Sequence, residues 1–254
     1  MKLKVGIPFA KHGRITDATL RSIKALEEVN DFEVEVVAQQ GSNVPRARNA
    51  MINQEKSNLV HQKLSGFDYF LCVDADTGFT VENVRQLLAH DLNIVSGACV
   101  LKHEATRFAA GWFSAIEGIS LMEDRVSIDR TGLFEVDWAG AAFLLLKKDA
   151  LESIPYPWFT SSEITYQTDL GACAHLVSED FGFCMKARQH GQKIMLDADC
   201  RVDHVPHPNE PGGGTISDAL NDLLRNRDTI IRHVTTMSEE NKKLKLILQE
   251  QGKE

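Results

Sequence analysis

The most constraining feature of the sequence is an apolar run that ends abruptly in two acids. Residues 69–73 (YFLCV) are aromatic, aliphatic and β-branched, which is typical of a buried strand in a mostly parallel sheet. Asp74 and Asp76 follow where this strand gives way to a loop, and in extended chain residues i and i+2 point to the same side. The two carboxylates are therefore expected to face one spot at the carboxyl edge of the sheet, where open α/β sheets bind ligands. Because two carboxylates there would repel, the pattern favours a hard divalent cation between them and an anion such as a diphosphate.

The Asp-x-Asp pair is a weak signal when taken alone, because an acidic turn after a strand has the same pattern.

Composition narrows the possible classes of protein. The 254 residues are 43% hydrophobic, enough for one large or two small domains. The formal net charge is -8 and no Lys/Arg-rich run occurs, which disfavours nonspecific binding to nucleic-acid phosphates or to an anionic membrane. The five cysteines show no paired metal spacing, and no secretory or membrane-spanning apolar segment is evident, so we expect a cytoplasmic protein.

The first forty residues predict a β-α-β unit. A strand from Leu3 to Ile7, broken by Pro8, is followed by a loop, a helix from Ile15 to Val29 and a second strand from Phe32 to Val37. No G-x-G-x-x-G follows the first strand, so a Rossmann dinucleotide site is unsupported.

Two polar residues stand out at the start of the next helix, which is expected from about Arg46 to Leu64. Cations at a helix start oppose the helix dipole, so Arg48, with its neighbour Asn49, is interpreted as reaching for a ligand anion. Arg46 is interpreted as a solvated surface residue.

The second half is expected to begin with a strand from Asn93 to Val100, a polar loop from Leu101 to Arg107 and a peripheral strand or hairpin in Gly118 to Arg130. Two apolar runs then flank a bend at Gly140 to Ala142, where small residues let a ligand approach the backbone. Trp138 beside the bend is either a face for a sugar ring or plain core.

A long polar segment, Thr160 to Ser178, is expected to be a binding loop or lid. Glu179 and Asp180 follow at the start of a helix that runs to His190, where acids also serve as ordinary first-turn residues. His204 lies in a short extended segment and would supply the third ligand that manganese accepts beside two carboxylates.

Taken in order, DAD, VDWAGAAFLLLKKDALESI, YPWF, SEDFGFCMKARQHGQKIMLD and a single later His resemble the metal-dependent glycosyltransferases of the GT-A fold, in particular the family 2-like group. RARNAMI is similar to the Arg-Asn helix start of related sugar transferases. The resemblance extends to about His207. It implies a GT-A-like α/β fold over residues 1–214, with a nucleotide-binding half (1–100) and an acceptor half (101–214).

The resemblance also implies roles for individual residues. Asp74 and Asp76 would hold Mn2+ or Mg2+ and the diphosphate of a nucleotide sugar, and His204 would complete the metal set. Asp180, beside Glu179, matches the general base of inverting members. Gln39 and Gln40 stand at the end of the second strand, where members of the family often have an acid. The identity of the donor's nucleotide base is therefore left open. The residues that would line the donor and acceptor are Pro8, Phe9, Ala10, Trp138, Gly140 and Ala141.

The implied activity is transfer of a sugar, of the hexosyltransferase type, to an acceptor hydroxyl. The cation would act as a Lewis acid on the leaving diphosphate, and a carboxylate of ordinary basicity would take the hydroxyl proton late in the attack. Inverting and retaining outcomes both stay open, as do a glycan, lipid-linked, protein or modified nucleic-acid acceptor. Two other interpretations remain: a sugar-1-phosphate nucleotidyltransferase, and a non-catalytic nucleotide- or sugar-binding oligomeric module.

The C-terminal segment, residues 215–254, is predicted to be a separate helix. Eight of the ten positions spaced alternately four and three apart from Ile216 to Leu248 are apolar, which is a heptad pattern. We expect a coiled coil that pairs with a second copy of the chain. The alternative is a helix folded back on the catalytic domain.

Overall fold

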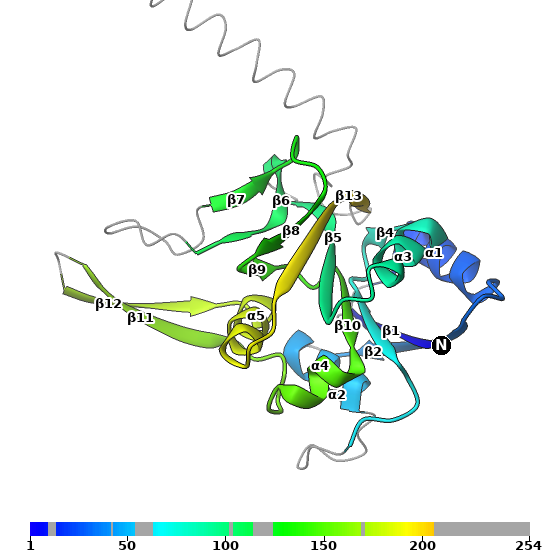
Figure 1. Ribbon diagram of the computed structural model, residues 1–254, viewed down its shortest axis with the longest axis horizontal. Helices are drawn as coiled ribbons and strands as arrows, with labels where there is room; N and C mark the ends of the chain where they lie inside the picture. The colour runs from blue at the N-terminus through cyan, green and yellow to red at the C-terminus, as the bar shows by residue number, and fades with distance from the viewer. Residues whose placement is uncertain are drawn as a thin grey trace, which may run out of the picture.

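The computed structural model describes residues 1–9, 14–41, 43–53, 63–101, 104–113, 124–168 and 171–205. Its main sheet has, in spatial order, β2 (Glu33–Gln40), β1 (Lys2–Phe9), β3 (Tyr69–Val73), β10 (Phe143–Lys147), β5 (Ile94–Leu101), β13 (Ile194–His204) and β4 (Thr77–Gly78). β1 is parallel to β2 and β3, and β5 is parallel to β13, whereas β10 runs antiparallel between β3 and β5. Helices flank this mixed sheet (Figure 1), so the predicted α/β, GT-A-like class is confirmed.

β3 is buried on both faces, as its uninterrupted apolar run predicts. Tyr69, Leu71 and Val73 belong to one hydrophobic cluster, and Phe70 and Cys72 belong to the other. This alternation is the two-residue period of a strand with helices on both sides. Burial raises the pKa of the Cys72 thiol to about 12, so this cysteine serves as a small hydrophobic residue.

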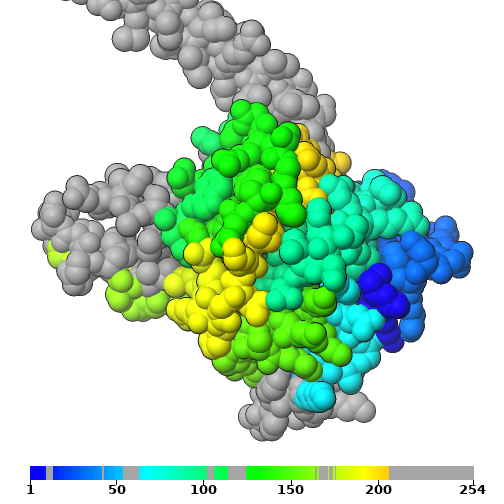
Figure 2. Space-filling model, viewed as in Figure 1, coloured from blue at the N-terminus to red at the C-terminus, as the bar shows by residue number. Residues whose placement is uncertain are grey.

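The helices divide between the two clusters. α1 (Asp17–Glu27) and α3 (Val81–Ala89) pack on one face, and α2 (Val44–Asn53), α4 (Lys148–Ser153) and α5 (Glu179–Gln189) pack on the other. Thr16 caps α1, and Thr80 forms a reciprocal capping box with Asn83 at the start of α3. Figure 2 shows residues of α5 and β13 (yellow) lying beside those of α3 and β5 (teal).

The second half adds short strands around β5 and β13. These are β6 (Glu104–Trp112), β7 (Asp124–Ser127), β8 (Leu133–Val136) and β9 (Trp138–Ala139). β6 pairs with β5, β7 and β9, and β8 pairs with β13. The predicted bend at Gly140–Ala142 separates β9 from β10, so the bend is confirmed.

Two predicted loops are wrong. The polar stretch from Leu101 to Arg107 is not a loop throughout, because β6 begins at Glu104. The segment from Thr160 to Ser178 forms an antiparallel hairpin of β11 (Ser162–Thr168) and β12 (Gly171–Val177), which projects from the body (Figure 1). A hairpin that stands away from the core needs strand-forming residues but no apolar alternation, so its hydrophobic period is absent from the sequence.

Three predicted boundaries are also corrected. β1 continues through Pro8. Pairing of β1 with β3 ends at Gly6, so the missing amide of Pro8 is tolerated. β13 joins two expected segments across a register shift between Asp197 and Arg201. The helix predicted to reach Leu64 starts earlier and is described only as far as Asn53; residues 54–62 lie outside the described part, and residues 63–65 are not helical.

The predicted coiled coil, residues 216–248, lies outside the described residues, as do Ala10 and His207. In the described part of the chain, no helix is both long enough and apolar enough to cross a membrane.

Candidate functional site

Asp74 and Asp76 lie in a turn after β3. The Asp74 amide donates to the Ala142 carbonyl at 3.1 Å, and the Asp74 carbonyl accepts from the Thr77 amide at 3.1 Å. The chain therefore folds back between Asp74 and Thr77, and the expectation of extended chain at these residues is wrong. Each acid instead has its own partners.

Asp74 is bound by Arg48, a buried residue of α2. The Arg48 side chain donates from Nη2 to Asp74 Oδ1 at 2.7 Å and from Nη1 to the Ala141 carbonyl at 3.0 Å. Its Nε lies 3.6 Å from Glu179 Oε1 and has no hydrogen-bond partner among the described residues. Burial favours the neutral form of Arg48, but the surrounding carboxylates, Asp74 first among them, keep its pKa above the ordinary value. We call Arg48, Asp74, Glu179 and the Ala141 carbonyl the Arg48 cluster.

Asp76 faces His204 because β4 pairs with the end of β13. The register places Thr77 opposite His204, and the Val205 amide donates to the Asp76 carbonyl at 2.7 Å. His204 Nε2 lies 3.3 Å from Asp76 Oδ2, and His204 Nδ1 lies 3.2 Å from the Val100 carbonyl. The predicted acid and imidazole, 128 residues apart in the chain (204 minus 76), are thus brought together.

Asp180 lies at the start of α5 with its two carboxylate oxygens in different surroundings. Oδ1 accepts from the Phe181 amide at 2.8 Å and is in contact with Ser178 Oγ. Oδ2 lies 3.5 Å from the position that a Cβ would take on Gly140. A Cβ at Gly140 would be in ordinary van der Waals contact with this oxygen, so the bend lies close to the Asp180 carboxylate. Ser178 was missed, although Ser before Glu-Asp is a usual helix-cap signal.

The fold perturbs the protonation of Glu179. Burial, and then the nearby charge of Asp180, raise its pKa above the ordinary value, while Arg48 acts in the opposite direction. The folded chain therefore binds this proton more tightly than the unfolded chain, a contribution that is complete below the ordinary glutamate pKa and is lost as pH rises through the raised pKa.

Glu179→Gln tests this pH dependence. The variant cannot ionise, so the difference in unfolding free energy, variant minus wild type, is expected to be more positive at about pH 8 than at about pH 4. Urea unfolding at both pH values measures it, with Glu27→Gln on an exposed position of α1 as the background. A difference that stays constant or falls with pH contradicts the assignment.

Asn49 holds the backbone of Phe159 next to the Arg48 cluster. Its side chain accepts from the Phe159 amide at 3.0 Å and donates to the Phe159 carbonyl at 2.6 Å. The Phe159 ring in turn lies under the Arg48 guanidinium, 5.6 Å from its carbon to the ring centroid. Phe159 was missed as a contributor, although it ends the aromatic YPWF stretch.

The other predicted residues lie around the same edge. Trp138 is buried against Phe181, with ring centroids 5.7 Å apart, and within the described part of the chain its Nε1 has no hydrogen-bond partner. Pro8 and Phe9 end β1, the strand beside β3. The Ala141 carbonyl belongs to the Arg48 cluster.

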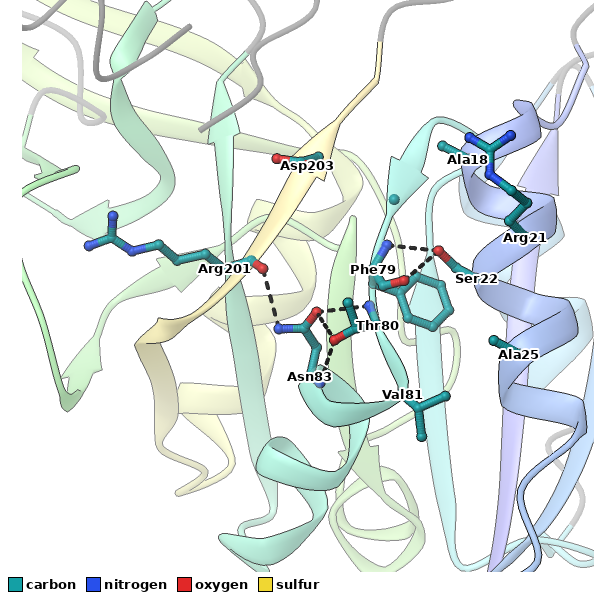
Figure 3. Close-up of a pocket in the computed structure, with 11 residues that line it drawn as sticks. Ala18, Arg21, Ser22, Ala25, Phe79, Thr80, Val81, Asn83, Arg201 and Asp203 are labelled. Atoms are coloured by element: carbon teal, nitrogen blue, oxygen red, sulfur yellow. Dashed lines mark hydrogen bonds between the residues drawn. The ribbon is translucent and has the colours of Figure 1, made fainter. Parts of the chain in front are cut away.

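A hollow of about 460 Å³ lies between α1, β4, α3 and β13 (Figure 3). Its polar groups are used within the fold. Ser22 Oγ accepts from the Phe79 amide at 2.9 Å, and Asn83 donates to the Arg201 carbonyl at 3.3 Å while the Arg201 guanidinium points away. This hollow is lined by neither Asp76 nor Asp180, so it is separate from the candidate site.

Asp76 and His204 fit a cation. If His204 Nδ1 donates to the Val100 carbonyl, the lone pair of Nε2 faces the Asp76 carboxylate, and a cation between the two groups would satisfy both. Such a hydrogen bond from the second ring nitrogen commonly orients metal-binding imidazoles. Asp74 is occupied by Arg48. Among the described residues, no three His, Cys, Asp or Glu side chains group closely enough to form a metal site by themselves.

Comparison with known proteins shows the fold. No family model matches the sequence, and no curated protein matches it. The chain is similar to the crystal structure of GalNAc-T7 with UDP, GalNAc and Mn2+, with a TM-score of 0.50 and 12% identity over 82% of this chain and 44% of that chain. It is also similar to the crystal structure of a protein from STIV, with a TM-score of 0.46 and 16% identity over 83% of this chain and all of that chain. The chain spans less than half the length of GalNAc-T7, and this likeness shows a shared GT-A-like fold.

Proposed function

We propose that this protein is a metal-dependent glycosyltransferase that moves a sugar from a nucleoside-diphosphate sugar to an acceptor hydroxyl. The observation that carries the proposal is the pairing of Asp76 with His204 where β4 meets the end of β13. A sheet edge that joins a carboxylate and an imidazole, next to the Arg48 cluster, provides one oxygen and one nitrogen ligand for a cation that binds a diphosphate.

Asp76 and His204 would hold Mn2+ or Mg2+, which supplies Lewis-acid stabilisation of the leaving diphosphate. The solved GalNAc-T7 structure contains UDP, GalNAc and Mn2+, which supports a nucleotide and a cation as the molecules bound by this protein. Asp74, held by Arg48, would face the donor. Pro8, Phe9 and Ala10 would lie against its nucleoside, and Trp138, Gly140 and Ala141 would border the sugar.

Asp180 would act on the acceptor. The acceptor oxygen forms a bond to the anomeric carbon as the bond from that carbon to the diphosphate oxygen breaks, and the hydroxyl proton passes to Asp180. The Oδ2 atom is the suitable one, because Oδ1 is held by the Phe181 amide and Ser178. Glu179 would place a negative charge at the start of α5, next to the Arg48 guanidinium. In a retaining reaction Asp180 would instead stabilise charge.

The proposed partners are a nucleotide-sugar donor, a glycan or other hydroxyl acceptor and, through residues 216–248, a second copy of the chain.

Binding of nucleoside diphosphates tests the proposal. Uridine, guanosine, adenosine and cytidine diphosphates are titrated calorimetrically into wild type with and without Mn2+. One of the four diphosphates is expected to bind only with Mn2+. Asp76→Asn is expected to weaken the affinity for this diphosphate by about 100-fold. Asp203→Asn, which removes a carboxylate one residue from His204 on β13, serves as the matched control and should bind as wild type does.

Metal-independent binding, or equal binding by wild type and Asp76→Asn, would contradict the proposal and make the Asp-x-Asp pair an acidic turn. Thermal unfolding provides a second measurement, because a ligand at about 100 times its dissociation constant stabilises the folded state by about 2.7 kcal/mol.

A further inference from the structure

Arg48 joins three segments of the proposed site through one side chain. It contacts Asp74 after β3, the Ala141 carbonyl at the bend before β10, and Glu179 at the start of α5. Only 4% of the side chain is exposed, so Arg48 reaches these groups from inside the protein and not from the ligand side. The expectation that its guanidinium meets a ligand anion directly is not supported by this placement.

The Arg48 contact gives Asp74 an orientation different from that of Asp76. The 2.7 Å bond from Nη2 is charge-assisted, and the Asp74 amide is fixed on the Ala142 carbonyl at 3.1 Å. The turn then carries Asp76 toward His204. One acid therefore has an internal cation as partner, and the other has an imidazole.

The protein also orients the guanidinium plane. Phe159 lies under it, and Asn49, on the same helix, holds the Phe159 backbone by two hydrogen bonds. A buried ion pair contributes little to stability on average, because the charges lose their hydration. A planar fork supported in this way is better explained by the geometry that it imposes on its partners.

We propose that Arg48 is a positioning residue that keeps Asp74 out of the ligand set of the cation and fixes the start of α5, so that Asp76 and His204 are the protein ligands. This inference rests on the proposed function.

Mn2+ binding in the presence of inorganic pyrophosphate tests the inference without knowledge of the donor base. Electron paramagnetic resonance titration of the full chain gives the affinity and the spectrum of bound Mn2+. Asp74→Asn is expected to bind within about threefold of wild type, whereas Asp76→Asn and His204→Ala lose about 100-fold. A loss at Asp74→Asn equal to that at Asp76→Asn makes Asp74 a ligand and overturns the inference.

The spectrum of bound Mn2+ separates positioning from a structural role. Arg48→Met frees Asp74 and should change the spectrum, and adding Asp74→Asn to that variant should restore the wild-type spectrum. Arg48→Lys, which keeps the charge, should stay nearer to wild type than Arg48→Met, and Arg46→Met on the exposed side of α2 should match wild type. An unchanged spectrum in folded Arg48→Met overturns the inference.

If Arg48→Met does not fold, the Asp74→Asn titration decides the question by itself. Failure of the proposed function has a different signature: Asp76→Asn and His204→Ala then bind Mn2+ with pyrophosphate as wild type does, whatever the Arg48 variants show.

Discussion

Replacing Asp180 by Asn is expected to lower kcat by about a thousandfold while Mn2+-dependent binding of the donor stays within about threefold, as befits loss of a general base. Asn keeps an oxygen for the hydrogen bond from the Phe181 amide, so the helix start keeps its local contact. What the variant loses is a basic oxygen beside Gly140. The effect is measured as an initial rate with the nucleotide sugar whose base calorimetry has identified. The readout is the nucleoside diphosphate released.

Asp149→Asn is the matched control. Asp149 is also an acid in the first turn of a helix, α4, and it is exposed. Both variants lose a favourable charge at a helix start, worth about 0.3–1 kcal/mol, but only Asp180→Asn is expected to lose turnover. A wild-type kcat in Asp180→Asn would exclude this residue as the base, and a fall in donor binding equal to the fall in kcat would assign it to the donor instead.

The sequence predicts those parts of the fold that depend on neighbouring residues. The apolar run of β3, the Thr16 and Thr80 caps and the end of α5 before Gly191 each follow from residues within a few positions. Each signal has one physical cause, either burial of both faces of a strand or satisfaction of free amides at a helix end. These elements are therefore confirmed nearly residue by residue.

The arrangement of the site depends on contacts between distant residues, which local patterns do not contain. β4 is only Thr77–Gly78, too short to show a period, yet its pairing with β13 brings Asp76 to His204. The sequence interpretation of Arg48 is a cation that reaches for a ligand anion, and its burial follows only from the meeting of β3, the bend and α5. The resemblance indicated which residues to compare, whereas the pairing of each acid required the structure.

α5 is held against the start of the hairpin by a close approach at Gly182. The Gly182 amide donates to the Ser178 carbonyl at 2.9 Å, within the first turn of the helix. A Cβ on Gly182 would lie 2.1 Å from the Thr160 carbonyl oxygen and 3.0 Å from Ser162 Oγ. Because the nearer of these atoms belongs to the backbone, the contact cannot be relieved by a side-chain rotation alone.

Gly182→Ala is therefore expected to lower the free energy of unfolding by about 2 kcal/mol, the clash costing about 3 and the better helix propensity of Ala returning about 1. Equilibrium urea unfolding measures the change, and Gly41→Ala, whose added Cβ would meet nothing nearer than 3.9 Å, should stay within about 0.5 kcal/mol of wild type. The displaced helix start carries Glu179 and Asp180, so kcat should fall together with stability. If Gly182→Ala were more stable than wild type, helix propensity would outweigh the contact, and α5 would not be fixed by the segment that leads into the hairpin.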